Sequence, residues 1–223
     1  MAKVLIIGDT HCPAMHPKYL PFLKRVYREH GCNRVVHIGD LVDWHAISFH
    51  EKDPSMPAPR DEIIKALEQV NKIKRAFPRV DYLMGNHSSL PLRKARMIGL
   101  PDEVMLPFET LWGLPNWKIH RRYAKLIIDG VQYRHGDSGK GGQFAASAQA
   151  KAEFQSVVQG DKHAQGGVVY HSNEGGRVFG LQVGCGVDPE HKAMNYARIY
   201  ASKPVLGCGV VINGKEGHFI PMH

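Results

Sequence analysis

The chain has 223 residues, of which 43% are hydrophobic and 22% are charged, an ordinary balance for a globular protein that builds its core without disulfide help. No run of about eighteen apolar residues is present, which excludes a membrane-spanning helix. The formal net charge of +8 favours an anionic partner such as nucleic acid or a phosphorylated substrate. Solvated helix and loop faces nevertheless explain any single basic cluster better. We expect one domain over residues 1–223.

The first half of the chain alternates between predicted strands and predicted helices. Its first apolar run, residues 4–7, is too short for a secretory signal and is typical of a buried strand. The expected elements are a strand at 4–7, a helix at 18–30, a strand at 34–38, a helix at 61–77 and a strand at 80–84. This alternation predicts a parallel sheet with right-handed crossovers.

The second half of the chain has a different pattern, in which strands predominate. Residues 125–128 and 131–134 flank Asp129-Gly130, which is typical of a β-hairpin with a type I′ turn. The later expected elements are a helix at 143–154 and strands at 156–159, 168–171, 178–183 and 210–220, the last interrupted by Asn213-Gly214. We therefore expect two packed sheets with helices outside them. Residues 100–122, with Trp112 and Trp117, contain no readable motif and are predicted to form a rim or lid.

Four short motifs follow one another along the chain, and a fifth, altered one comes after them. They are Asp9-Thr10-His11, Gly39-Asp40-Leu41-Val42-Asp43, Gly85-Asn86-His87, His135-Gly136-Asp137 and Gly160-Asp161-Lys162-His163. The first three motifs follow predicted strands directly, and the carboxyl ends of parallel strands meet at one edge of an open sheet. Carboxylate, amide and imidazole groups are donors that hold divalent cations. The sequence therefore predicts a metal site assembled from distant segments.

This order of motifs resembles that of the calcineurin-like metallophosphoesterase superfamily, and most closely its phage and bacterial branch. The resemblance covers nearly the whole chain and implies a four-layer α/β/β/α sandwich, with two mixed sheets flanked by helices. It also implies two divalent metal ions. Mn²⁺ is favoured, and Fe, Zn, Ni and Mg are alternatives because the mixed donor set does not select one metal. The four cysteines form no Cys-x-x-Cys pair, which favours a reducing cytoplasm over a zinc ribbon or a redox motif.

The resemblance gives each motif residue a role. The positions matched to metal ligands are Asp9, His11 and His163 for the first metal, Asn86, His135 and Asp161 for the second, and Asp40 between them. His87 would donate a proton to the leaving alkoxide, and Asp43 would hold His87 by a hydrogen bond. Hydrolysis would proceed by attack of a hydroxide that bridges the two cations.

The chain departs from the family pattern at three positions. Ser88 replaces the Asp or Glu that usually follows Gly-Asn-His, and it is a candidate N-cap for the basic segment after it. Asp161 replaces a metal-ligating His, which would suit the second site to Mn²⁺ or Mg²⁺ better than to Zn²⁺. Trp44 replaces an Arg that grips phosphate in phosphoprotein phosphatases, which leaves that function to other cations such as Arg93 or Lys140.

The sequence thus predicts a cytoplasmic metal-dependent phosphoesterase, located in the host cytoplasm if the chain is phage-encoded. Phosphodiester substrates, either nucleic acid or nucleotide, are favoured by the basic balance and by the resemblance. A phosphomonoesterase is the enzymatic alternative. A catalytically weakened fold used for binding or scaffolding is the alternative from another class, and the presence of both His87 and Asp43 argues against it. No membrane partner is expected, and the sequence leaves the oligomeric state open.

Overall fold

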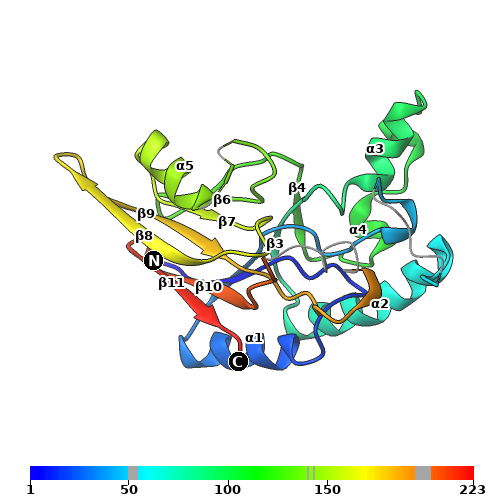
Figure 1. The fold of residues 1–223 in the computed structure, drawn as a ribbon, viewed down its shortest axis with the longest axis horizontal. Helices are drawn as coiled ribbons and strands as arrows, with labels where there is room; N and C mark the ends of the chain where they lie inside the picture. The colour runs from blue at the N-terminus through cyan, green and yellow to red at the C-terminus, as the bar shows by residue number, and fades with distance from the viewer. Residues whose placement is uncertain (50–54, 140, 143, 194–201) are drawn as a thin grey trace.

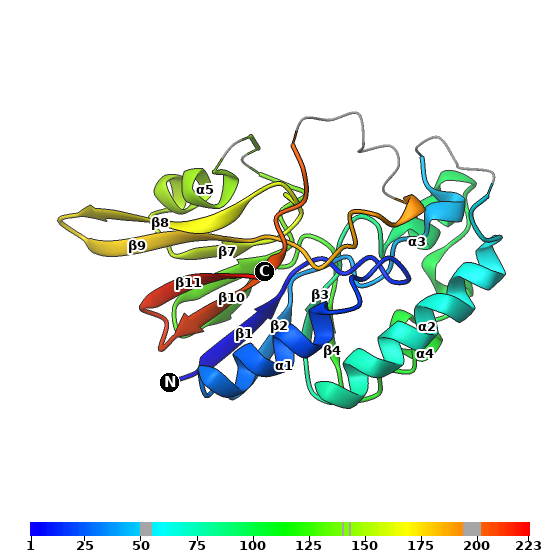
Figure 2. The ribbon, with the colours of Figure 1, turned by 60° about the horizontal axis from the view of Figure 1, so that its bottom comes forward.

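A computed structural model describes residues 1–49, 55–139, 141–142, 144–193 and 202–223. Within these ranges, two mixed β-sheets pack face to face, and helices lie on their outer faces (Figures 1 and 2). The predicted four-layer α/β/β/α sandwich is confirmed. None of the helices in the described ranges is long and apolar enough to cross a membrane.

The first sheet has six strands in the order β11-β10-β1-β2-β3-β4. The strands are β1 (Lys3–Ile7), β2 (Arg34–His37), β3 (Asp81–Leu83), β4 (Lys118–His120), β10 (Gly207–Ile212) and β11 (Glu216–Pro221). Strands β1 to β4 run parallel, and β10 pairs antiparallel with both β1 and β11. The parallel strands therefore end at the same edge of the sheet, as the alternation of strands and helices predicted.

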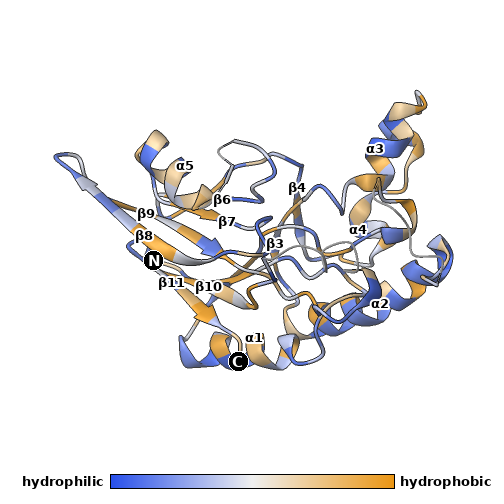
Figure 3. Ribbon diagram, viewed as in Figure 1, coloured by the Kyte–Doolittle hydropathy of each residue, from blue (hydrophilic) through white to orange (hydrophobic). Residues whose placement is uncertain are grey.

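Helices α1 (Tyr19–Glu29) and α2 (Pro59–Ala76) cover the outer face of the first sheet. Hydrophobic and hydrophilic residues alternate along α2 in Figure 3, which is the pattern of a helix with one face in the core and one in solvent. Because side chains alternate across a strand, Leu5 and Ile7 of β1 point toward the helices and pack with Leu23 and Val70. Each buried aliphatic side chain of this kind contributes roughly 1.5–3 kcal/mol.

The second sheet has five strands in the order β5-β6-β7-β9-β8. They are β5 (Leu126–Ile128), β6 (Val131–Arg134), β7 (Val157–Gln159), β8 (Gly166–Asn173) and β9 (Gly176–Val183). Strands β6, β7 and β9 are parallel, whereas the edge strands β5 and β8 are antiparallel to their neighbours. Helix α5 (Ala145–Glu153) lies against β7, β8 and β9 on the outer face. The inner face packs against the first sheet, where Ile6 and Val36 join Val158 and Leu181 in one apolar cluster.

Two hairpin turns, the predicted one at Asp129-Gly130 and a second at Asn213-Gly214, have the positive φ angles of a type I′ turn. Asp129 and Gly130, between β5 and β6, have φ angles of 48° and 80°. Asn213 and Gly214, between β10 and β11, have φ angles of 55° and 70°. Two successive residues at positive φ match the twist of the flanking strands, which is why Asp-Gly and Asn-Gly pairs are favoured there.

The prediction of a rim or lid is wrong for Trp112 and Trp117. The segment before β4 folds into α3 (Leu90–Met97), a 3₁₀ turn η2 (Asp102–Val104) and α4 (Phe108–Leu111). Trp112 is 1% exposed and Trp117 is 6% exposed, and the Trp117 Nε1–H donates to the Phe77 carbonyl at 3.1 Å. The two rings fill the core between the first sheet and its helices. The segment connects β3 to β4 and contains no sequence motif, so its buried position can be recognised only from the packing.

Candidate metal centre

The five motifs meet where strands of both sheets end. Asp9 follows β1, Asp40 lies beyond the end of β2, and Asn86 lies beyond the end of β3. His135 follows β6 directly, so the second sheet contributes to the same site. The last motif follows β7, the strand beside β6. The convergence predicted from the sequence is therefore present in the fold.

Two motif glycines are needed for this convergence because the protein packs against their α-carbons. A Cβ at Gly39, whose φ is +134°, would lie 2.0 Å from Nδ1 of His135. A Cβ at Gly85 would lie 2.1 Å from Oδ1 of Asp40. Both distances are far inside van der Waals contact, so only glycine allows His135 and Asp40 to occupy their positions.

The first cluster consists of Asp9, His11 and His163, whose ligand atoms all lie within 4.8 Å of one another. The His163 Nε2 is 3.0 Å from Asp9 Oδ2. Two further atoms, Asp9 Oδ1 and His11 Nε2, are buried and have no hydrogen-bond partner among the described residues. Buried polar atoms of this kind are costly unless something binds them. One carboxylate and two imidazoles suit a divalent transition-metal ion, so the residues fit the metal that the resemblance implies.

The second cluster surrounds the Nε2 atom of His135. That atom lies 3.2 Å from Asp40 Oδ2, 3.0 Å from Asn86 Oδ1 and 3.7 Å from Asp161 Oδ1. The other ring nitrogen, Nδ1, lies 3.0 Å from the carbonyl oxygen of Ile38, to which it donates. A backbone acceptor on one ring nitrogen orients the other nitrogen toward its ligand, as is usual for metal-binding histidines. Asp9, Asp40 and His135 also form a group of potential ligands, so the two clusters adjoin.

Asp161 lies in the site but is only partly available as a ligand. Its backbone N–H donates to Asp9 Oδ2 at 3.0 Å, which ties the altered motif to the first cluster. Its side-chain Oδ2 accepts a hydrogen bond from Lys162 Nζ. One carboxylate oxygen therefore faces His135, and the other is engaged by the adjacent lysine.

Asp43 contacts two histidines, although the sequence predicted only one of these contacts. Its Oδ1 lies 3.0 Å from His87 Nδ1, as predicted, and 2.7 Å from His11 Nδ1. The rings of His11 and His87 are 4.6 Å apart, centroid to centroid. One carboxylate thus orients a predicted metal ligand and the predicted proton donor together. The second contact joins residues 32 positions apart, and no local pattern marks it.

The charges within the site shift several pKa values. Burial by itself raises the pKa of Asp40 and of Asp43, but the neighbouring histidines outweigh burial and hold both well below the usual range. Burial by itself lowers the pKa of His87, but its hydrogen bond to Asp43 and the charge of Asp40 raise it to about 9. For His135, Asp40 and Asp9 likewise overcome burial and raise the pKa to about 10. At neutral pH, before a cation binds, both carboxylates are ionised and both rings are protonated.

The prediction that Ser88 caps a helix is wrong. Helix α3 begins one residue later, after Ser89, and no side-chain hydrogen bond caps it. Ser88 is buried, and its backbone N–H donates to Asp40 Oδ1 at 3.1 Å, beside the N–H of His87 at 2.9 Å. Two successive backbone donors therefore hold one oxygen of Asp40, and the segment after Gly-Asn-His is used to fix a carboxylate instead of to start a helix.

Two buried residues that support the site lie outside the sequence motifs, and the sequence did not predict a role for them. Glu62 is buried in α2 and accepts the backbone N–H groups of His45 and Ala46 at 2.7 and 2.9 Å. It thereby anchors the 3₁₀ turn η1 (His45–Ile47) that follows Asp43. His37 at the end of β2 is buried behind the clusters, where its Nε2 lies 3.2 Å from Thr10 Oγ1, and burial lowers its pKa to about 3. In the sequence, Glu62 is one of many polar residues on a helix, so only tertiary contacts identify it.

Trp44, which stands where related phosphatases have a phosphate-gripping Arg, is part of the core. Its side chain is 7% exposed and lies edge-on to Trp112, with the ring centroids 5.6 Å apart. Of the two cations suggested in its place, Arg93 donates from its guanidinium to the Asn86 carbonyl at 3.2 Å, and Lys140 lies outside the described residues. Helix α3 therefore supplies one of the cations beside the site among the described residues.

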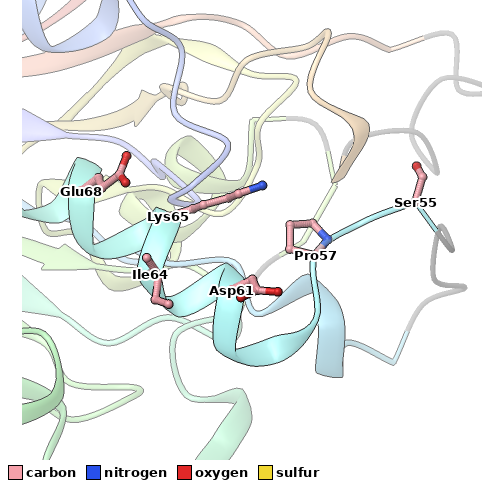
Figure 4. A pocket seen from close by; sticks show the side chains of 6 residues that line it. All are labelled: Ser55, Pro57, Asp61, Ile64, Lys65 and Glu68. Carbon is pink, nitrogen blue, oxygen red and sulfur yellow. The ribbon is translucent and has the colours of Figure 1, made fainter.

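An open hollow lies along α2, away from the motif residues. It is lined by Ser55, Pro57, Asp61, Ile64, Lys65 and Glu68 (Figure 4). None of the predicted site residues lines this hollow. The metal centre is instead a set of mostly buried side chains at the strand ends, so the hollow does not mark it.

Comparisons with known proteins agree with this geometry. A family model described as calcineurin-like phosphoesterase matches residues 2–150, and the chain belongs to this family. Membership of this family implies divalent metal ions and phosphoester substrates, and the two clusters provide potential ligands for such ions. No curated protein matches the chain.

Several solved structures resemble the chain in fold. The Escherichia coli phosphoesterase YfcE is 14% identical, with 95% of this chain and 88% of that chain covered and a TM-score of 0.43. The Pseudomonas putida nuclease MPE is 13% identical, with 98% and 87% covered and a TM-score of 0.44. Vacuolar protein sorting 29 from Cryptosporidium parvum is 13% identical, with 94% and 85% covered and a TM-score of 0.45. At these identities and TM-scores the likeness says nothing about the activity of this chain.

Proposed function

We propose that this chain is a two-metal phosphoesterase of the phage and bacterial type, that it hydrolyses phosphodiesters, and that residues 1–223 act as one domain. The proposal rests on two buried ligand atoms that have no hydrogen-bond partner among the described residues, Asp9 Oδ1 and His11 Nε2, beside a second cluster around His135. A buried carboxylate oxygen and a buried imidazole nitrogen, both without hydrogen-bond partners in one cluster, are expected where a cation binds. The net charge of +8 supports an anionic substrate such as a nucleic acid or nucleotide.

The proposed ligands divide between the clusters as the resemblance implies. Asp9, His11 and His163 hold the first cation, Asp40 lies between the two, and Asn86, His135 and Asp161 serve the second. Two divalent cations, when bound, supply Lewis acidity and lower the pKa of water. Asp161 adds a carboxylate where relatives have an imidazole, which favours Mn²⁺ or Mg²⁺ over Zn²⁺ at the second cluster.

His87 is the residue placed to protonate the leaving group. Its side chain is 15% exposed, whereas that of His11 is fully buried, so of the two rings beside Asp43 only His87 has access to a substrate. Because its pKa is raised to about 9, the ring carries a proton at neutral pH. Asp43 holds the Nδ1 side, which leaves the Nε2 proton free for the departing oxygen. The ring becomes neutral as the alcohol leaves, and solvent returns the proton.

A binding or scaffold function is the alternative from another class, and Asp161 is the residue that motivates it. The Asp43–His87 pair argues for catalysis because a raised imidazole pKa and an oriented Nδ1 have no use in a scaffold. A phosphomonoesterase would use the same residues and differs only in substrate. All four cysteines are free and buried, which supports the proposal of a cytoplasmic protein.

The test is hydrolysis of bis-p-nitrophenyl phosphate beside p-nitrophenyl phosphate, across a Mn²⁺ titration. Chelator-sensitive turnover, with the diester preferred, is the expected result, and adding metal back after chelation should restore it. Preference for the monoester would replace the diester proposal with a phosphomonoesterase. No turnover of either ester by protein with two bound equivalents of metal would favour the scaffold.

A further inference from the structure

Phe49 presents an aromatic ring on the surface beside two cations. The residue follows η1 and is 52% exposed. Lys94 Nζ lies 4.1 Å from the centroid of the ring, and the guanidinium carbon of Arg93 lies 5.2 Å from it. Within the described part of the chain, neither cation forms an ion pair with a carboxylate, whereas the nearby Arg96 is paired with Asp102. A single exposed Phe is ordinary. An exposed Phe beside two cations that have no carboxylate partner among the described residues is a feature to explain.

This group is joined to the metal centre by direct contacts. Arg93, which lies over the Phe49 ring, also donates to the backbone carbonyl of Asn86 at 3.2 Å. The Asn86 side chain lies 3.0 Å from His135 Nε2 in the second cluster. His87, the proposed proton donor, is the next residue in the chain. The ring and its cations are therefore connected to the second cluster through Arg93 and Asn86.

We propose that Phe49, Arg93 and Lys94 form a subsite for single-stranded nucleic acid next to the scissile phosphodiester. In this subsite Phe49 stacks on an unpaired base, and the two cations contact the neighbouring backbone phosphates. The inference rests on the proposed phosphodiesterase function and names its substrate class. Aromatic rings flanked by Lys and Arg are how proteins bind single strands without reading their sequence. A duplex keeps its bases stacked on each other and offers no free face to the ring.

The alternative is that the cations only hold Phe49 against α3 and so fix the loop after η1. A ring used in this way affects folding but not the affinity for nucleic acid. The chain contains a matched control for this case. Arg177 lies 5.1 Å from the centroid of Tyr170, which is 40% exposed, on the β8–β9 hairpin at the far end of the molecule from α3 (Figure 1).

The test is binding of a fluorescein-labelled oligothymidylate, measured by anisotropy at low salt in the presence of chelator, so that no strand is cut. Phe49→Ala and Lys94→Ala are each expected to weaken binding at least about fivefold, because stacking on one base and one phosphate contact each contribute at this level. Phe49→Trp should restore the affinity, and Arg177→Ala should leave it unchanged. An unlabelled duplex of equal length should compete poorly.

Four results would overturn the proposal: no binding by the unaltered chain, unchanged binding by Phe49→Ala, an equal loss in Arg177→Ala, or equal competition by the duplex. Thermal melting of each variant separates a binding effect from unfolding, and the Trp variant separates ring stacking from loop position. Since binding is measured without turnover, its outcome is independent of the ester-hydrolysis test. Single-strand binding without ester hydrolysis would keep the subsite and reject the phosphodiesterase, and the reverse result would do the opposite.

Discussion

The two clusters of the metal centre differ in how the protein engages their donor atoms. In the first cluster, Asp9 Oδ1 and His11 Nε2 are buried and unsatisfied within the described chain. In the second, His135 Nε2 already lies within 3.2 Å of both Asp40 and Asn86, and Lys162 engages Asp161. A cation entering the first cluster meets two unsatisfied atoms and displaces one contact between its ligands, that of His163 with Asp9, whereas one entering the second must displace several. The comparison therefore predicts a tight first site and a weaker second site.

The two clusters also differ in the pKa values of their histidines, and this difference favours metal binding at the first cluster in the same way. Burial and the nearby His87 lower the pKa of His11, so its ring is neutral at physiological pH and ready to bind a metal. The pKa of His135 is raised to about 10 by Asp40 and Asp9 despite burial, so this ring must lose a proton before it can ligate. The two histidines are thus prepared differently. For His11, burial and the charge of His87 outweigh the hydrogen bond to Asp43, whereas for His135 the carboxylates outweigh burial.

The largest expected effect comes from removing the carboxylate that anchors the first cluster. Asp9→Asn removes the negative charge that His163 contacts and leaves one side-chain oxygen in place of two, so metal binding at the tight site and turnover should both be lost. Metal content after dialysis, measured by mass spectrometry, checks this. Asp61→Asn on the exposed face of α2 is the matched control and should retain the metal. Retention of the tighter metal by Asp9→Asn would show that the first cluster has been assigned wrongly.

Removing the proton donor should leave both clusters filled. His87→Ala is expected to lower kcat by about 10²–10⁴ with metal content unchanged, since the ring acts only on the leaving group. A substrate with a leaving group of low pKa should recover much of the rate because it needs no proton. His171→Ala on β8, which removes a ring hydrogen-bonded to Ser147 of α5, serves as the control. An undiminished rate in His87→Ala would remove the general-acid role.

Asp43→Asn should combine the two kinds of loss, because one carboxylate oxygen meets both His11 and His87. Loss of an orienting carboxylate behind a metal-binding histidine typically costs about 10–100-fold in metal affinity. We therefore expect weaker binding of the first metal together with a reduced kcat, in contrast to His87→Ala. Isothermal titration with Mn²⁺ measures the affinity. If kcat falls and the first affinity does not, Asp43 serves His87 alone.

The two binding events should differ in their dependence on pH. With the pKa of His135 near 10, filling the second cluster releases about one proton at pH 8, and its apparent affinity should rise about tenfold per pH unit up to that pKa. The ring of His11 contributes no such release to the first cluster. Titration calorimetry in buffers of different ionisation enthalpy counts the protons. Equal proton release in both events would contradict the contrast.

The smallest effect is expected at Asp161. Replacing it with His removes the Lys162 contact and supplies a neutral imidazole, so Asp161→His should raise second-site affinity for Zn²⁺ severalfold and raise activity with that metal. Lys162→Arg keeps a cation beside Asp161 and is the control. Lower activity in Asp161→His would instead mark the carboxylate as a working ligand and weaken the scaffold alternative further.

The sequence by itself predicted the alternating elements of the first half and the motif residues that the fold brings together at the strand ends. Apolar runs, helical spacing and the Asp129-Gly130 turn depend on neighbouring residues, so they can be recognised locally. The motif residues could be found because each follows a strand, and parallel strands must end together. The seven proposed metal ligands, with His87 and Asp43, all lie in these motifs.

Only the tertiary structure decided how these residues are connected. Three features depend on residues 32 or more positions apart in the sequence. They are the contacts of Asp43 with both His11 and His87, the burial of Trp112, and the contact of Lys94 with Phe49. The different readiness of His11 and His135 likewise depends on which charges the folded chain places beside each ring. Electrostatic and packing energies act through space, so residues distant in sequence set them, and no local pattern reports them.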